Sequence, residues 1–129
     1  MNRTDLLERL TAFAIRIIGM VRVLPKDAAG WTIGRQIVRS GTSIVANVEE
    51  AIGALTRPGF LNKYVIARKE ARETLRRLII IDRARLLPHN RLVNLLAEVN
   101  EIVAILTKSV KTIQRKPSVE ADPKLAPNP

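Results

Sequence analysis

Apolar residues recur at every third or fourth position along most of the chain, in four stretches separated by prolines and polar residues. This spacing predicts four amphipathic helices. The first extends from position 4 or 5 to about Val23. Asp5 and Glu8 have the spacing of a capping box, and Pro25 ends the helix because it keeps the residue before it out of helical geometry. The apolar stripe consists of Leu6, Leu7, Leu10, Phe13, Ala14, Ile17, Ile18 and Val21.

Similar signals bound the other three helices. The second is predicted over about residues 28–54, with Asp27 as a candidate N-cap. The third follows Thr56, a second candidate N-cap with a proline in the first turn after it, and extends to about Leu87. The fourth covers about residues 91–115 and has the most regular apolar stripe of the four.

Four helices with short connections predict an all-α, up-down-up-down four-helix bundle over residues 1–116. Residues 117–129 contain four prolines and are predicted to form a disordered tail. The composition agrees with a bundle: apolar residues make up 47% of the chain but aromatic residues only 3%, which favours packing of aliphatic helices over a β-sandwich. The absence of cysteine excludes disulfides and thiolate zinc sites.

Catalytic and metal-binding chemistry is poorly supported by the residues. Glu98 and Glu101 have a spacing found in di-metal bundles, but the only histidine, His89, falls in a predicted loop, so both are interpreted as solvated surface charges. Ser43 has no histidine to act as its base, and the chain has no glycine-rich loop to hold phosphates. We therefore expect no enzymatic activity, no metal or other cofactor, and no small-molecule substrate.

The N-terminal segment carries charged residues and does not resemble a signal peptide. No stretch approaches the run of about 20 apolar residues that crosses a bilayer. From these features we expect a soluble, cytoplasmic protein without a membrane partner.

The most specific pattern lies in the second predicted helix, where residues 36–51 read QIVRSGTSIVANVEEA. Polar residues recur there at spacings of four and three, which places them along one side of a helix. They are Gln36, Ser40, Ser43, Asn47 and Glu50. Serine and asparagine are poor helix formers, so a row of them indicates contact with a neighbouring helix or with a partner.

A matching row in the third helix includes Lys63, Glu70, Glu73 and Arg77. If the two helices are neighbours, Arg39 can pair with Glu70 or Glu73, and the polar row can satisfy the remaining donors and acceptors. The predicted network for packing or for a subunit interface comprises Gln36, Arg39, Ser43, Asn47, Glu50, Glu70 and Glu73. The alternative is that the row from Lys63 to Arg77 forms an ordinary solvated helix face with surface ion pairs.

Charge indicates an anionic partner. The net charge is +10, from 22 Lys and Arg against 12 Asp and Glu, and the sequence pI is near 11.1. The candidate residues for binding RNA or DNA are Arg68, Lys69, Arg72, Arg76, Arg77, Lys108 and Lys111. Aromatic residues are too few to favour base stacking, so contacts with phosphates are expected. The alternative is a purely structural or protein–protein interaction module whose charge serves only solubility.

The segment QIVRSGTSIVANVEEA resembles the second-helix signature of four-helix-bundle proteins encoded by intervening sequences of bacterial 23S rRNA genes. Gln36, Arg39, Ser43, Asn47 and Glu50 match that signature position by position. Arg57, Phe60 and the stretch ARKEARE, residues 67–73, are also similar to the family. The resemblance covers roughly residues 5–115. After Glu73, relatives often have aromatic residues where the present chain has Leu75, Arg76, Arg77 and Leu78.

The resemblance implies a left-handed up-and-down bundle that assembles as a homo-oligomeric ring, with a pentamer favoured, and it does not imply an enzyme. A related group of basic pentameric bundles is a partner of reverse transcriptases in diversity-generating retroelements. Binding of RNA or DNA is therefore expected by analogy only.

Overall fold

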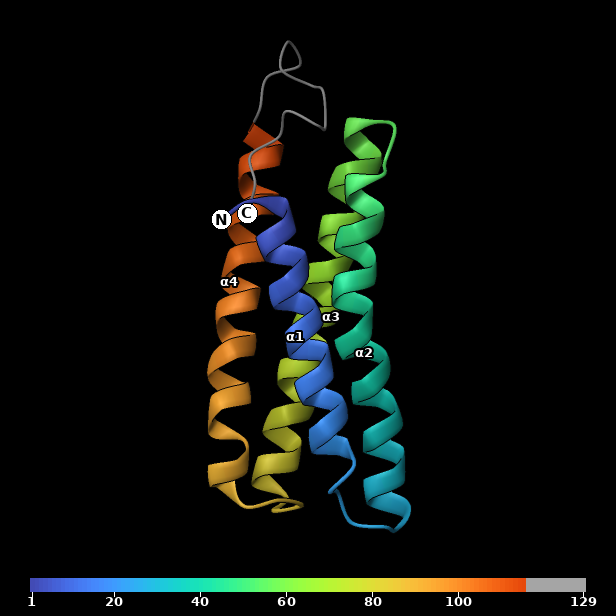
Figure 1. Ribbon diagram of the computed structural model, residues 1–129, viewed down its shortest axis with the longest axis vertical. Helices are drawn as coiled ribbons and strands as arrows, with labels where there is room; N and C mark the ends of the chain where they lie inside the picture. Colours follow the sequence, from blue (N-terminus) through green and yellow to red (C-terminus); the bar gives the residue numbers. More distant parts are fainter. Residues whose placement is uncertain (116–129) are drawn as a thin grey trace.

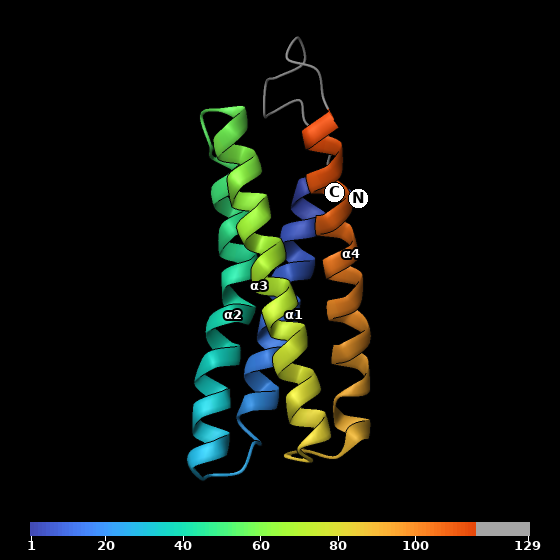
Figure 2. The same cartoon turned by 180° about the vertical axis from the view of Figure 1, so that it is seen from behind.

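The computed structural model describes residues 1–115, and within this range four long helices lie side by side in one bundle (Figure 1). These helices are α1 (Arg3–Val21), α2 (Ala28–Ile52), α3 (Arg57–Arg83) and α4 (Val93–Arg115), and a short 3-10 helix, η1 (His89–Arg91), precedes α4. Each long helix runs antiparallel to the one before it, and the view from behind shows α3 between α2 and α4 (Figure 2).

The predicted all-α four-helix bundle is confirmed. Its left-handedness and the division into a bundle and a tail stay predictions. The predicted disordered segment, residues 117–129, lies outside the described residues. Within the described residues, no helix has an apolar stretch of the length and hydropathy needed to cross a bilayer.

Helix α1 begins earlier than the sequence pattern indicated. Asn2 is the N-cap: its side chain accepts a hydrogen bond from the Asp5 amide at 2.8 Å, and the Asp5 carboxylate accepts one from the Asn2 amide at 3.5 Å. The predicted capping box from Asp5 to Glu8 is therefore wrong by three residues. Asparagine is among the strongest N-caps, and it allows the helix to start at Arg3, one or two residues before the predicted start. At its other end, α1 stops at Val21.

The two predicted N-caps further along the chain are confirmed. Asp27 accepts a hydrogen bond from the Gly30 amide at 2.9 Å, and Thr56 accepts one from the Gly59 amide at 3.1 Å. The turn before α2 is so tight that a Cβ on Gly30 would lie 1.8 Å from the carbonyl oxygen of Pro25. Only glycine fits at this position, because any side chain would overlap the backbone of the turn.

The predicted end of α3 at Leu87 is wrong, because the helix ends at Arg83. Arg85 has a φ of 58°, in the left-handed region, and reverses the chain. Two hydrogen bonds close this end: the Leu86 amide donates to the Ile81 carbonyl at 3.0 Å, and the Arg85 amide donates to the Asp82 carbonyl at 3.1 Å. This arrangement is a Schellman motif with arginine at the position where glycine is preferred.

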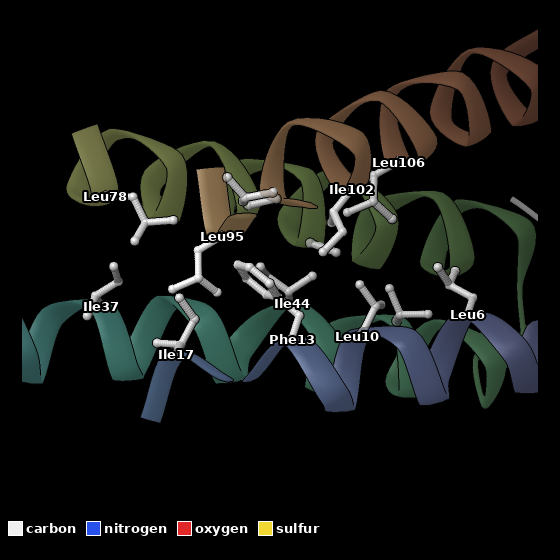
Figure 3. Packing of buried hydrophobic residues seen from close by; sticks show 14 of the residues in the cluster. Leu6, Leu10, Phe13, Ile17, Ile37, Ile44, Leu78, Leu95, Ile102 and Leu106 are labelled. Atoms are coloured by element: carbon white, nitrogen blue, oxygen red, sulfur yellow. The ribbon is translucent and has the colours of Figure 1, made fainter. Parts of the chain in front are cut away.

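Aliphatic side chains from all four helices fill the interior of the bundle (Figure 3). Figure 3 shows residues of α1, α2, α3 and α4 pointing toward one another between the helices. The labelled residues are Leu6, Leu10, Phe13, Ile17, Ile37, Ile44, Leu78, Leu95, Ile102 and Leu106, all buried. Burial of such side chains stabilises a fold by about 1.5–3 kcal/mol each, so this interior holds the helices that carry the polar and basic surfaces described below.

Candidate polar network and basic surface

Two hydroxyl groups form the buried centre of the polar contact between α2 and α3. The Thr74 hydroxyl lies 2.8 Å from the Ser40 hydroxyl and 2.8 Å from the Glu70 carbonyl oxygen, and both side chains are fully buried. Ser40 also lies 3.4 Å from the carbonyl oxygen of Ile37. The sequence-based site did not include this pair. Two features of the sequence could have indicated this contact: Ser40 belongs to the polar row of α2, and Thr74 lies one turn after Glu70.

Beside this pair, an ion-pair cluster links α2 to α3. The Arg39 guanidinium lies 2.8 Å from the Glu70 carboxylate and 3.7 Å from that of Glu73, and Arg77 lies 3.6 Å from Glu73. The Arg39 side chain is 55% exposed, whereas that of Glu70 is only 10% exposed. The cation therefore covers a nearly buried carboxylate from the solvent side, which keeps that charge paired.

The pKa of Glu70 follows from this position. Burial raises the pKa of its carboxyl, but the hydrogen bond with Arg39 and the positive charge of Arg39 outweigh burial and lower it below the ordinary value. The hydrogen bond with Glu70 in turn raises the pKa of Arg39. Both groups are therefore charged at neutral pH.

The other residues of the predicted network contribute less to the contact with α3. Ser43 donates to the Arg39 carbonyl at 2.7 Å, and Asn47 donates to the Ser43 carbonyl at 2.8 Å, so both bond within their own helix. Glu50 pairs with Lys63 of α3 at 3.0 Å. Gln36 is exposed. The structure thus brings Arg39, Glu70 and Glu73 together, and places Glu50 in a separate ion pair.

A second cluster, which the sequence did not reveal, joins α1 to α4. The Arg9 guanidinium makes two hydrogen bonds of 2.8 Å with the Glu98 carboxylate and also contacts Glu101. The hydrogen bond with Arg9 lowers the pKa of Glu98, although burial opposes it. The interpretation of Glu98 as a solvated charge was wrong, because its side chain is only 17% exposed. In the described residues, no group of three or more carboxylate or histidine side chains is placed to hold a metal ion.

The basic residues of α3 lie on its outward side. Lys69, Arg72 and Arg76 are exposed and follow one another at spacings of three and four residues, while Arg68 is half-buried. Together with Val65 and Glu73, they line a shallow depression of about 300 Å³. No carboxylate of the described residues lies within ion-pair distance of these four cations. We call them the α3 cation row.

The remaining predicted cations are placed differently. Arg77 is half-buried and paired with Glu73 of the same helix, so its charge is less available to an outside partner than that of the exposed cations. Lys108 and Lys111 are exposed on α4, where they and Arg115 border a depression of about 470 Å³.

Comparison with known proteins adds a family and a fold relative. A family model described as 23S rRNA-intervening sequence protein matches residues 3–108. The chain is also similar to the crystal structure of a protein of unknown function from the S23 ribosomal protein family of Bacteroides thetaiotaomicron VPI-5482. The two are 33% identical, the match covers 87% of this chain and 100% of the other, and the TM-score is 0.80. No curated protein matches the chain significantly.

Proposed function

The chain belongs to the 23S rRNA-intervening sequence protein family, and we propose that it is a non-enzymatic, homo-oligomeric bundle that binds RNA or DNA through the α3 cation row. The family name links such proteins to ribosomal RNA genes. The name of the solved structure that resembles this chain refers to a ribosomal protein family. Both names favour a nucleic acid over other anionic partners. Lys108 and Lys111 are proposed as further phosphate contacts.

This proposal rests on a difference between the charged groups of the described bundle: most carboxylates have a partner within the chain, whereas the cations of the α3 cation row do not. Most carboxylates are engaged within the chain, in ion pairs or as helix caps: Asp5, Asp27, Glu50, Glu70, Glu73, Asp82, Glu98 and Glu101. The α3 cation row has no such partner among the described residues. Contacts with phosphates need only cations of this kind, and they provide affinity without sequence preference.

The arrangement of the row suits a phosphate backbone. Seven residues of helix separate Lys69 from Arg76, a rise of about 10 Å, and Arg72 lies between them on the same face. A ring of several copies, with a pentamer favoured, would repeat this row around the assembly. Repetition would increase the effective concentration of cations along one nucleic acid and strengthen binding without any new contact.

The absence of an enzymatic role is part of the same proposal. The only histidine in the chain, His89, hydrogen-bonds Asp82 at the turn between α3 and α4, with 2.9 Å between Nδ1 and the carboxylate. The hydroxyl of Ser43 donates to a backbone carbonyl of its own helix. These contacts support a binding protein over a hydrolase that uses serine and histidine.

Fluorescence anisotropy with labelled RNA and DNA duplexes tests nucleic-acid binding. The variant Arg72→Glu/Arg76→Glu is compared with Arg22→Glu/Arg35→Glu, which has the same net charge but alters a different surface. We expect the α3 variant to bind more weakly and to lose about two units of salt slope, because each phosphate contact contributes about 0.9. We expect the other variant to keep the slope of the wild type.

Equal losses in the two variants would mean that overall charge alone determines retention of nucleic acid, and the proposed site would then be wrong. Circular dichroism checks that both variants remain helical. Sedimentation equilibrium tests the assembly: we expect a mass several times the 14.4 kDa of one chain, and a monomer at micromolar concentration would contradict the homo-oligomer.

A further inference from the structure

An apolar groove lies where α1 ends and α2 begins. It has a volume of about 540 Å³, within the range of ligand-binding pockets. Its walls come from the last turn of α1, the connecting turn and the first half of α2, and they are mostly aliphatic. The wall residues are Val21, Leu24, Pro25, Gly30, Gly34 and Val38.

Two glycines explain why the groove stays open. Gly30 is required by the tight turn, as described above, and a Cβ on Gly34 would lie 3.1 Å from the Cγ1 atom of Val21. Since neither position carries a side chain, α2 approaches the end of α1 closely and nothing from these positions covers the aliphatic wall.

The only tryptophan of the chain borders this groove. Trp31 lies in the first turn of α2, and it is 56% exposed. Tryptophan is the residue most enriched in the energetic centres of protein interfaces, together with tyrosine and arginine. An exposed indole next to an aliphatic groove therefore indicates a contact surface for apolar side chains.

The rim of the groove is positively charged. Arg22, Lys26 and Arg35 border it, and no carboxylate of the described residues lies within ion-pair distance of these three cations. Arg39 also borders the groove, but Glu70 and Glu73 already neutralise it. Asp27, the N-cap of α2, offsets the positive end of the helix dipole there, so the charge of the rim comes from Arg22, Lys26 and Arg35. The occupant should therefore carry negative charge.

We propose that this groove binds a short acidic segment of a partner protein, with apolar side chains against Trp31 and the aliphatic wall and carboxylates directed to Arg22, Lys26 and Arg35. A nucleic acid fits less well, because the edges of its bases would find few hydrogen-bonding groups on aliphatic walls. A second copy also fits less well. Among the described residues, only the carboxylates of Glu8 and Glu49 are neither paired nor capping, and they lie on different helices.

Trp31 provides the assay, because its emission responds directly to occupation of the groove. The probe is an acetylated peptide in which the unit Glu-Leu-Leu-Glu is repeated three times, a sequence that is amphipathic as a helix and contains no tryptophan. Two control peptides replace either every glutamate by lysine or every leucine by alanine. We expect the acidic, leucine-containing peptide to shift the emission to shorter wavelength in a saturable manner, and each control to bind about tenfold more weakly or worse.

Two charge-reversed variants with equal net charge separate this site from general attraction to a basic protein. Arg22→Glu/Arg35→Glu should weaken binding of the acidic peptide by about tenfold or more, because carboxylates lose their partners and meet like charges. Arg72→Glu/Arg76→Glu should leave peptide binding nearly unchanged. These expectations do not depend on nucleic-acid binding, which has its own readout.

Several results would overturn the proposal. Equal weakening in both variants, or an emission spectrum that the peptide does not change, would show that the groove does not select an acidic apolar segment. A shift of Trp31 emission that follows protein concentration together with molecular mass would assign the groove to a second copy. Quenching by RNA that is lost only in Arg22→Glu/Arg35→Glu would assign it to a nucleic acid.

Discussion

Replacement of Arg85 by glycine tests how the structure ends α3. The backbone of Arg85 has a φ of 58°, and its amide donates the inner hydrogen bond of the Schellman motif. In this left-handed region, a Cβ atom crowds the neighbouring carbonyl oxygen and costs about 1–2 kcal/mol, whereas glycine carries no such penalty. The Arg85 side chain is exposed and forms no ion pair with the described residues, so its removal costs little.

The expected gain is smaller than the strain itself. Glycine makes the unfolded chain more flexible, which offsets about 0.4–1 kcal/mol of the relief. The net effect of Arg85→Gly should be an increase of about 0.5–1 kcal/mol in the free energy of unfolding. In a chain of 129 residues this corresponds to a rise in Tm of about 2–4 °C.

Two control variants separate relief of strain from loss of charge. Arg85→Ala removes the guanidinium but keeps a Cβ at positive φ, so it should be no more stable than the wild type. Ala84→Gly changes a residue whose φ of −77° suits any amino acid, and it should destabilise by about 0.5–1 kcal/mol. Urea unfolding followed by circular dichroism measures all three. If Arg85→Gly is no more stable than Arg85→Ala, the argument from backbone strain fails.

Three further predictions concern the interior and the ion pairs. Thr74→Val should lower the free energy of unfolding by about 1–2 kcal/mol, because it leaves the buried Ser40 hydroxyl without its closest partner. A double-mutant cycle with Ser40→Ala should show coupling, and strict additivity would argue against the contact. Gly30→Ala should cost about 3 kcal/mol in denaturant unfolding, since its Cβ would overlap the facing carbonyl oxygen, and a loss below about 1 kcal/mol would contradict that close approach. The pKa values of Glu70 and Glu98 are lowered in the folded state, so the stabilisation from these carboxylates should be complete above the ordinary value of 4.5 and should disappear as the pH falls through the lowered values. Urea midpoints measured from neutral to acidic pH check this, and Glu70→Gln with Glu98→Gln should flatten the profile.

The sequence was sufficient for the bundle because each helix carries an aliphatic stripe and most boundaries carry an explicit signal. Asp27 and Thr56 are such signals, and both cap their helices. The errors arose where the signal was weak or unusual. Leu86 and Leu87 continue the apolar pattern of α3 beyond its end, and the residue that reverses the chain is an arginine instead of a glycine. Hydrophobic periodicity alone cannot show that end.

The polar contacts were harder to predict than the helices. Arg39 contacts both partners that the spacing allowed, Glu70 and Glu73, because α2 and α3 are consecutive and antiparallel. The pair of Arg9 and Glu98 joins helices at opposite ends of the chain. Which faces of such helices meet depends on the rotation of each helix about its axis, and the packing of the whole interior sets that rotation. Spacing within one helix contains no information about it.

The two proposed surfaces use different helices, with the carboxylates of α3 between them. The groove is formed by α1, the following turn and α2, whereas the cation row lies on α3. Glu73 borders the depression on α3 and also pairs with Arg39, which borders the groove. Because Glu70 and Glu73 hold Arg39 within the protein, an acidic ligand in the groove must rely on the outer rim cations, and a nucleic acid on α3 does not compete for them. If both proposals hold, a single copy has room for an acidic protein segment and a nucleic acid at the same time, which would make the bundle an adaptor between the two.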